Sequence, residues 1–192
     1  KYYTTKTGSS TSYVEDVPEN RVDGNTPEGS RSYARDLYEK ESGIQDGLDK
    51  NDIYNRASTG GKMQADGSIL TKDGNSALGV TESQTIKKGN FWNYSVERKH
   101  SIYLSNKAFA SREQLSFIMQ HELNHVRIYN AGLEGIANQA LKLKSDAAKR
   151  YKQLLDNIGH YHIQESGTEF LRVNGWYNIK SSIPSSVFST GN

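Results

Sequence analysis

Residues 111–132 read SREQLSFIMQHELNHVRIYNAG, and this stretch predicts the central helix of the fold. Ser111 followed three residues later by Gln114 is the spacing of a capping box, in which a serine side chain binds a free amide at the start of a helix. Gly132 is the residue type that commonly ends a helix. Between these ends apolar residues recur with helical spacing and predict a buried side: Leu115, Ile118, Met119, Val126 and Ile128.

Two histidines of this helix are spaced to share a ligand. His121 and His125 lie four residues apart, so both imidazoles face the same side and can reach one metal ion. Glu122 follows the first histidine, where its carboxylate can hold a water molecule and take its proton. Two His ligands and a Glu base in this spacing form the pattern of zinc hydrolases. We therefore expect one zinc ion per chain; the alternative is two solvated histidines that happen to flank a glutamate.

A catalytic zinc site needs a third protein ligand. A metzincin-like continuation would place Gly at 128 and His at 131, but the chain has Ile128 and Ala131, so this class is excluded. The third ligand must then come from another segment. The predicted last helix, residues 160–174, offers His and Glu side chains within ten residues: His160, His162, Glu165 and Glu169.

Glu165 is the favoured third ligand, because His₂Glu is an established zinc set. His162 is the alternative ligand; otherwise it is a catalytic residue that donates a hydrogen bond to the developing oxyanion. Glu169 could instead accept the N–H of a metal-bound histidine. Glu134 is a weaker candidate, because it falls in the short connection after the central helix. An ordinary solvated polar stripe on the last helix is the competing interpretation.

Other residues are candidates to stabilise an oxyanion or to guide a substrate. The tyrosines Tyr129, Tyr161 and Tyr177 could donate to an oxyanion, although tyrosines more often fill core and rim. The predicted strand Ser101–Ser105 could offer an exposed edge to an extended peptide, or it could be an ordinary core strand. We expect His100 to lie on the surface.

The composition excludes several classes of protein. The net charge is +2 without a long like-charge run, which argues against nucleic-acid binding. The absence of Cys excludes disulfides and thiolate metal sites, so a transition metal must be held by His and carboxylate groups. No apolar run reaches membrane-spanning length. We therefore expect a soluble chain without membrane insertion, and its start at Lys1 suggests a processed form or a part of a larger protein.

The pattern along the chain predicts an α+β fold in one domain. Residues 1–29 read as an N-terminal arm or linker with a short strand or hairpin, residues 30–177 as the domain, and residues 178–192 as a flexible tail. The expected sheet is small and antiparallel and packs on the central helix, together with two further helices. The expected elements are a helix at 30–41, a small turn-rich hairpin within 60–89, two antiparallel strands in 91–104 joined near 97–100, and helices at 133–155 and 160–174.

Residues 117–126, FIMQHELNHV, preceded by the strand Ser101–Ser105, resemble the minimal zincin core of strand, motif helix and ligand-bearing helix. The later segment HYHIQE at 160–165, with Phe170 and NGW at 174–176, is similar to the last helix of metallopeptidase domains at the C-termini of bacterial RHS-type polymorphic toxins. In this resemblance, which covers about residues 101–177, the Glu after the His-Tyr pair is the metal ligand, and it corresponds to Glu165.

The resemblance implies a zinc metallopeptidase of the gluzincin type that hydrolyses peptide bonds with Glu122 as base. It also implies a toxin domain that is secreted or delivered into a target cell, with an immunity protein as partner in the producing cell. His162 departs from the pattern as an extra potential ligand. Two alternatives stay open from the residues themselves: a degenerate zincin that binds a partner and holds zinc structurally, and a zinc amidase that acts on non-peptide amides.

Overall fold

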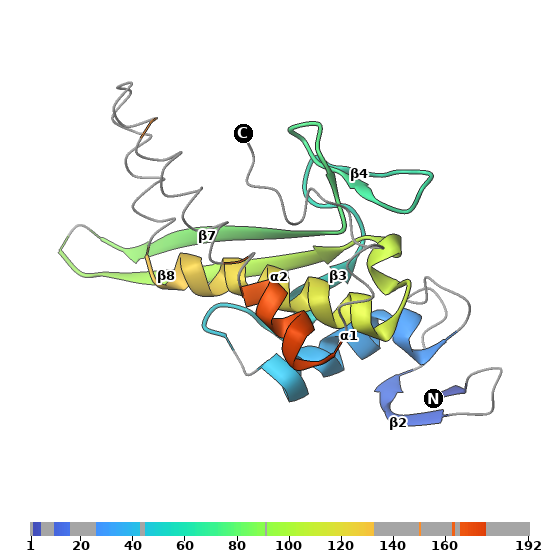
Figure 1. Cartoon of the computed structure of the whole chain (residues 1–192). Coiled ribbons are helices and arrows are strands. Elements are labelled where there is room, and N and C mark those ends of the chain that lie inside the picture. Colours follow the sequence, from blue (N-terminus) through green and yellow to red (C-terminus); the bar gives the residue numbers. More distant parts are fainter. Residues whose placement is uncertain are drawn as a thin grey trace.

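The computed structural model describes residues 2–4, 10–15, 26–42, 45–90, 92–132, 150, 163 and 166–175. These residues form an α+β fold in which helices pack on one face of a small mixed sheet and a second, antiparallel sheet lies at its edge (Figure 1). Among the described residues, none of the helices combines the length and the apolar character needed to cross a membrane.

The central sheet has the strand order β3-β8-β7, formed by β3 (Ile53–Asn55), β8 (Tyr94–Leu104) and β7 (Gly79–Gly89). β7 and β8 form a long antiparallel hairpin, whereas β3 pairs with β8 in parallel. The prediction of a purely antiparallel sheet is therefore wrong. The parallel pairing was not predictable, because β3 and β8 are far apart in sequence and the pairing of distant strands leaves no local signal.

Two predictions for this hairpin are also wrong. Residues 94–104 form one strand, without a turn near 97–100, and residues 79–89 form its partner strand and not a turn-rich segment. The turn lies at Asn90–Asn93, where Oδ1 of Asn90 accepts hydrogen bonds from the backbone N–H groups of Trp92 (3.1 Å) and Asn93 (2.9 Å). The many polar residues of β7 weaken the sequence signal for a strand, since none of the described helices covers the outer face of this sheet.

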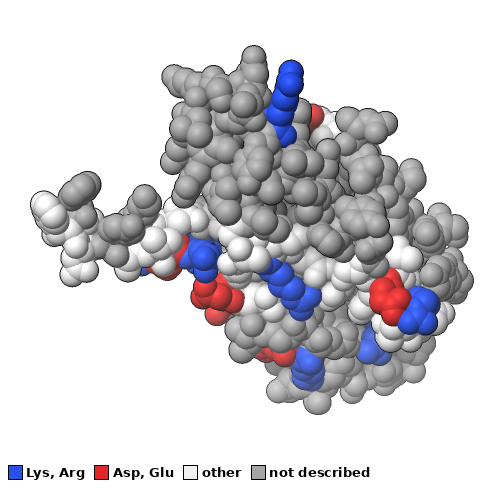
Figure 2. Space-filling view, turned by 60° about the vertical axis from the view of Figure 1, so that its left-hand side comes forward, with Lys and Arg blue, Asp and Glu red and all other residues white. Residues whose placement is uncertain are grey.

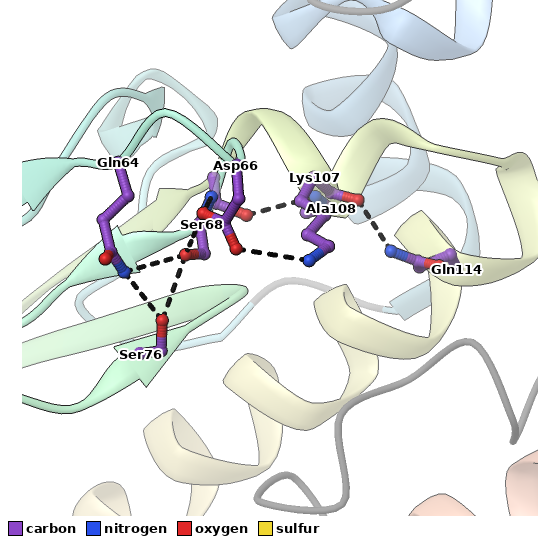
Figure 3. Close-up of polar contacts among 8 residues, drawn as sticks. Gln64, Asp66, Ser68, Ser76, Lys107, Ala108 and Gln114 are labelled. Carbon is purple, nitrogen blue, oxygen red and sulfur yellow. Dashed lines mark hydrogen bonds and ion pairs between the residues drawn. The ribbon is translucent and has the colours of Figure 1, made fainter.

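Helix α2 (Arg112–Asn130) is the predicted central helix, and its position is confirmed. Ser111 caps it: its Oγ accepts a hydrogen bond from the N–H of Gln114 at 3.1 Å. The reciprocal bond of a capping box is not formed, because the Gln114 side chain donates to the carbonyl of Lys107 at 2.6 Å (Figure 3). Gly132 has a φ of 90° just after the helix, a conformation that glycine adopts without strain. The predicted apolar side is buried except for Ile128, which is half-buried; the buried residues include Leu115, Ile118, Met119, Leu123 and Val126.

The small antiparallel sheet consists of β4 (Lys62–Met63), β5 (Ile69–Leu70) and β6 (Ser76–Ala77). This sheet contains the predicted hairpin, formed by β4 and β5, and one further strand, β6. A polar network fixes it to the 3₁₀ helix η5 (Asn106–Phe109), which precedes α2 (Figure 3). Asp66 is at the centre: its carboxylate accepts from the Ser68 hydroxyl at 2.6 Å and from Lys107 Nζ at 3.3 Å. These donors hold the pKa of Asp66 at about 2.

Helix α1 (Arg31–Leu37) continues into a π-helical segment, Tyr38–Ser42, and confirms the helix predicted at 30–41. Before it, β1 (Tyr2–Thr4) and β2 (Ser10–Glu15) pair as the expected N-terminal hairpin. The shorter 3₁₀ helices are η2 (Pro27–Gly29) and η4 (Lys50–Asp52). Of the helix predicted at 133–155 only residue 150 is described, and it is helical; the tail at 178–192 lies outside the described residues. Residues 166–173 are helical, as predicted for the last helix, and Gly175 with a φ of 69° follows them.

Candidate metal centre

The two histidines of the motif lie side by side on α2. The ring centroids of His121 and His125 are 5.1 Å apart, with an angle of 67° between the ring planes. Both residues are half-buried. One turn of α-helix separates them, which brings the two imidazoles to the same face, as the spacing predicts. Two imidazoles on one face of a helix can supply half of a tetrahedral zinc set.

Glu122 is buried, with 3% of its surface exposed, and it faces the edge strand β7. The hydroxyl of Thr81 lies 2.7 Å from Oε2 of Glu122 and 3.1 Å from its backbone carbonyl oxygen. Gly79 lies beneath the same side chain: a Cβ at this position would be 2.5 Å from Oε1 and 2.8 Å from Cγ of Glu122. β7 therefore fixes the carboxylate through one hydrogen bond and one close backbone approach.

The surroundings of Glu122 act on its ionisation in opposite directions. Burial raises the pKa of the Glu122 carboxyl above its ordinary value, because a charged group loses hydration there. The charge on His125 and the hydrogen bond from Thr81 both act to lower this pKa, but burial has the larger effect. A carboxylate with a raised pKa accepts protons more readily than an exposed one, which suits a general base.

The rest of the predicted ligand set is outside the described residues. Glu165 and His162 are not among them, nor are the other candidates Glu134, His160, Tyr161 and Tyr177. Within the described part of the chain, no group of three or more His, Cys, Asp or Glu side chains is arranged to hold a metal ion. The imidazole pair fits two positions of a zinc site, and the third ligand stays a prediction.

The last helix packs on α2 beside the motif. The side chain of Asn124 donates a hydrogen bond from Nδ2 to Oγ of Ser166 at 3.1 Å, and its Oδ1 accepts one from Arg127 at 2.9 Å. Gly167 lies against the ring of Phe117, and a Cβ there would be 3.1 Å from Cε2. Ser166 directly follows Glu165 in the sequence. The described contacts therefore bring Ser166 and Gly167, which follow the predicted third ligand in the sequence, to α2.

Glu169 does not behave as expected for an acceptor of a metal-bound histidine. It is exposed, and both of its carboxylate oxygens accept hydrogen bonds from Arg172, at 2.7 and 2.5 Å. This is a surface ion pair between residues three apart on a helix.

A groove of about 1110 Å³ passes the candidate metal centre. It reaches His125 and Tyr129 on α2, crosses the edge strand β7 and continues over the outer face of the central sheet. Tyr129 is 5% exposed, and its hydroxyl forms a hydrogen bond of 2.7 Å with the hydroxyl of Thr85. Tyr129 is therefore largely a packing residue whose polar end is already engaged.

The sheet edge beside the motif is β7, and the expectation of an exposed edge at Ser101–Ser105 is wrong. Residues 101–104 belong to β8, and residues 102–104 are paired with β3 on one side and β7 on the other, while Ser105 caps η5. Ile102 and Leu104 have no exposed surface and belong to the core. The core-strand interpretation of this segment is the correct one.

His100 is also placed differently from the prediction, because it is completely buried. Its Nδ1 lies 2.8 Å from the hydroxyl of Ser83, and its Nε2 lies 2.9 Å from Oδ1 of Asn130. Asn130 uses its amide nitrogen to donate to the carbonyl of Asp46 at 2.9 Å. His100 thus ties the last residue of α2 to the hairpin and to a loop, and the two hydrogen bonds compensate for its burial.

Sequence reasoning missed Gly79 and Thr81, the residues that hold Glu122. Their one sequence signal is the enrichment in β-branched residues from Val80 to Ile86, which favours a strand. No local pattern links this strand to a helix residue 41 positions later.

Comparison with protein-family models, with curated protein sequences and with solved structures finds no match for this chain.

Proposed function

We propose that this chain is a zinc-dependent peptidase in which Glu122 is the general base. One observation carries the proposal: a buried carboxylate, fixed by Thr81, lies on the same helix as two adjacent imidazoles, and one of them, that of His125, lines a groove. A glutamate without a chemical role would gain more from exposure to water, because the burial of a carboxylate is costly. Functional sites are where such costs are commonly found.

The residues divide the reaction between them. His121 and His125, with Glu165 as the proposed third ligand, would hold the zinc ion, which supplies Lewis acidity toward a scissile carbonyl. Glu122 accepts the proton of the attacking water and later delivers it to the leaving amine. The hydrogen bond from Thr81 and the backbone of Gly79 fix the carboxylate in one orientation during both transfers.

The contact between Asn124 and Ser166 supports the last helix as the source of the third ligand. It joins the motif helix to the residue after Glu165 by a hydrogen bond of 3.1 Å. His162 keeps its proposed role as a donor to the oxyanion or as an alternative ligand. Both assignments rest on the sequence pattern and on this contact.

The substrate that fits best is an extended polypeptide along β7. β7 is an edge strand among the described strands, so one side of its backbone has no described strand partner and could pair with a peptide. Residues 80–84 of this strand line the groove, which also reaches His125. Its outer wall includes a loop held in place by Glu82, whose carboxylate accepts hydrogen bonds from the backbone N–H (2.7 Å) and the hydroxyl (2.9 Å) of Thr59.

The electrostatic surface favours a protein substrate over a nucleic acid. On the face seen in Figure 2, the described Lys and Arg side chains alternate with Asp and Glu and form no continuous basic surface. Nucleic-acid binding domains commonly have such a surface. A role as a secreted or delivered toxin domain, with an immunity protein as partner, remains part of the proposal through the resemblance of residues 160–176.

The proposal is tested by digestion of an unfolded protein mixture with the zinc-loaded chain, followed by mass-spectrometric identification of new peptide termini. We expect new termini that disappear after chelation and return when zinc is added. The His121→Ala and His125→Ala variants should yield none. New termini that persist in these variants, or their absence with the zinc-loaded wild type, would contradict the proposal.

A further inference from the structure

The far end of the β7–β8 hairpin extends past α2 as a narrow arm (Figure 1). We call residues 86–97 the hairpin arm; its strands are paired from Ile86 with Glu97 to Gly89 with Tyr94. Thr85, the residue before the arm, hydrogen-bonds Tyr129 near the end of α2, and the arm continues beyond this contact.

The tip of the arm is an ordered turn that presents a tryptophan to solvent. The Asn90 side chain accepts hydrogen bonds from the backbone of Trp92 and Asn93, and the Asn90 N–H donates to the carbonyl of Asn93 at 3.1 Å. Three hydrogen bonds thus define the turn. Yet Trp92 is 90% exposed, so the turn gains nothing from burial of the indole.

Exposed large apolar side chains concentrate on this arm. Among the described residues three large hydrophobics are strongly exposed, and two of them, Trp92 and Val96, belong to the arm. The sequence places Phe91 and Tyr94 on either side of Trp92. Tryptophan has a large apolar surface and one polar N–H, and it is favoured where one end of the side chain is apolar and the other is wet. Such a tip is typical of an interaction surface.

Positive charge is concentrated behind the same tip. The hairpin arm has two basic residues and one acidic residue, and two further basic residues follow it directly in β8, so residues 86–99 carry a net charge of +3, whereas the whole chain carries +2. The rest of the chain therefore has a net charge of −1. The acidic residue, Glu97, forms an ion pair with Lys88, and Arg98 forms one with Asp46 at 3.7 Å. The basic residues are Lys87, Lys88, Arg98 and Lys99.

We propose that the hairpin arm binds the surface of an anionic phospholipid bilayer, with Trp92 at the level of the headgroups and the net positive charge of residues 86–99 attracted to the lipid phosphates. Aromatic residues such as Trp and Tyr favour this interfacial region, and each Lys or Arg near an anionic surface adds attraction. The net positive charge of residues 86–99 favours this partner over a neutral apolar one. The chain lies on the membrane in this arrangement and does not span it.

The test is co-sedimentation of the full chain with vesicles of neutral phosphatidylcholine and with vesicles in which roughly a third of the lipid is phosphatidylglycerol. The wild type should bind the anionic vesicles and should be released by high salt, since salt screens the attraction. Trp92→Ser should weaken binding at least about tenfold. Lys87→Gln with Lys88→Gln should weaken it by about thirtyfold. Val173→Ser, which changes an exposed apolar residue outside the arm, should bind like the wild type.

Fluorescence locates the contact. The chain has two tryptophans, so in a Trp176→Phe background the emission reports on Trp92 and should shift to shorter wavelength when anionic vesicles are added. Equal binding to neutral vesicles, or binding of Trp92→Ser at wild-type strength, overturns the proposal. A dimer in light scattering that disappears in Trp92→Ser also overturns it, because the arm would then bind a second copy of the chain. Circular dichroism confirms that each variant is folded.

Discussion

Thr81 on the edge strand donates a hydrogen bond of 2.7 Å to the buried carboxylate of Glu122 on the motif helix. The two residues are 41 positions apart in sequence, and the contact joins the sheet to the residue that we propose as general base. The fold thereby determines the orientation of Glu122. The helix alone would leave this side chain free to choose among rotamers.

Two replacements of Thr81 should distinguish the contribution of its hydroxyl from the contribution of its side-chain shape. Thr81→Val keeps the volume but removes the donor, and we expect the free energy of unfolding to fall by about 1–3 kcal/mol, as for a lost hydrogen bond to a charged group. Peptidase activity should fall about tenfold, because the base is no longer held in place. Thr81→Ser keeps the hydroxyl and should restore most of both quantities. Equal behaviour of the two variants in thermal unfolding and in kcat would refute this role.

A methyl group at position 79 should displace the proposed base. In Gly79→Ala the Cβ would lie 2.5 Å from Oε1 of Glu122, so the side chain or the strand has to move. We expect a loss of about 1–3 kcal/mol in the free energy of unfolding, measured by chemical denaturation, and a larger loss of kcat than of zinc affinity. Gln84→Ala, an exposed position on the same strand, is the control and should change the stability by less than about 0.5 kcal/mol. Wild-type kcat in Gly79→Ala would argue against the close approach.

Asn124 should influence metal binding from a distance if the third ligand is on the last helix. Asn124→Ala removes the hydrogen bond to Ser166, and Ser166→Ala removes the same bond from the other side. Each variant should weaken zinc binding by about 10–100-fold in a competition titration. The double variant should be little worse than either single one, because both remove one interaction. Unchanged zinc affinity in both single variants would show that this hydrogen bond does not influence zinc binding.

The Asp66 network should make the stability depend on acid pH. Its carboxyl has a folded-state pKa of about 2, lowered from 3.8 by the hydroxyl and amide of Ser68 and by Lys107. A lowered folded-state pKa means that this stabilisation is complete above pH 4 and is lost as the pH falls toward 2. In thermal unfolding, the melting temperature of the wild type should exceed that of Asp66→Asn at neutral pH, and the difference should shrink as the pH approaches 2. A difference that is constant with pH would disagree with the shifted pKa.

The central helix was predictable because its signals are local. Ser111 and Gly132 mark its ends, the apolar spacing between them predicts its buried side, and the structure confirms these features. The adjacency of His121 and His125 follows from the same local geometry.

The sheet and the surroundings of Glu122 were not predictable, because they depend on pairing between distant segments. The antiparallel partner of β8 is β7, whose outward side chains are largely polar. Its sequence therefore resembles a turn-rich segment more than a strand. His100 resembles a surface residue in sequence, yet Ser83 and Asn130, from two different elements, allow it to be buried. Nothing local to Gly79 or Thr81 indicates that a helix carboxylate will lie on them.

The most direct measurement for the proposed function is the rate of peptide cleavage by zinc-loaded Glu122→Gln, compared with the wild type at equal zinc content. Gln keeps the size of the side chain and can still accept the hydrogen bond from Thr81, but it cannot take a proton from water. We predict that the variant binds zinc and remains folded, while kcat falls by about 10²–10⁴-fold. Cleavage at the wild-type rate by the zinc-loaded variant would contradict the assignment of Glu122 as the base and, with it, the proposed mechanism.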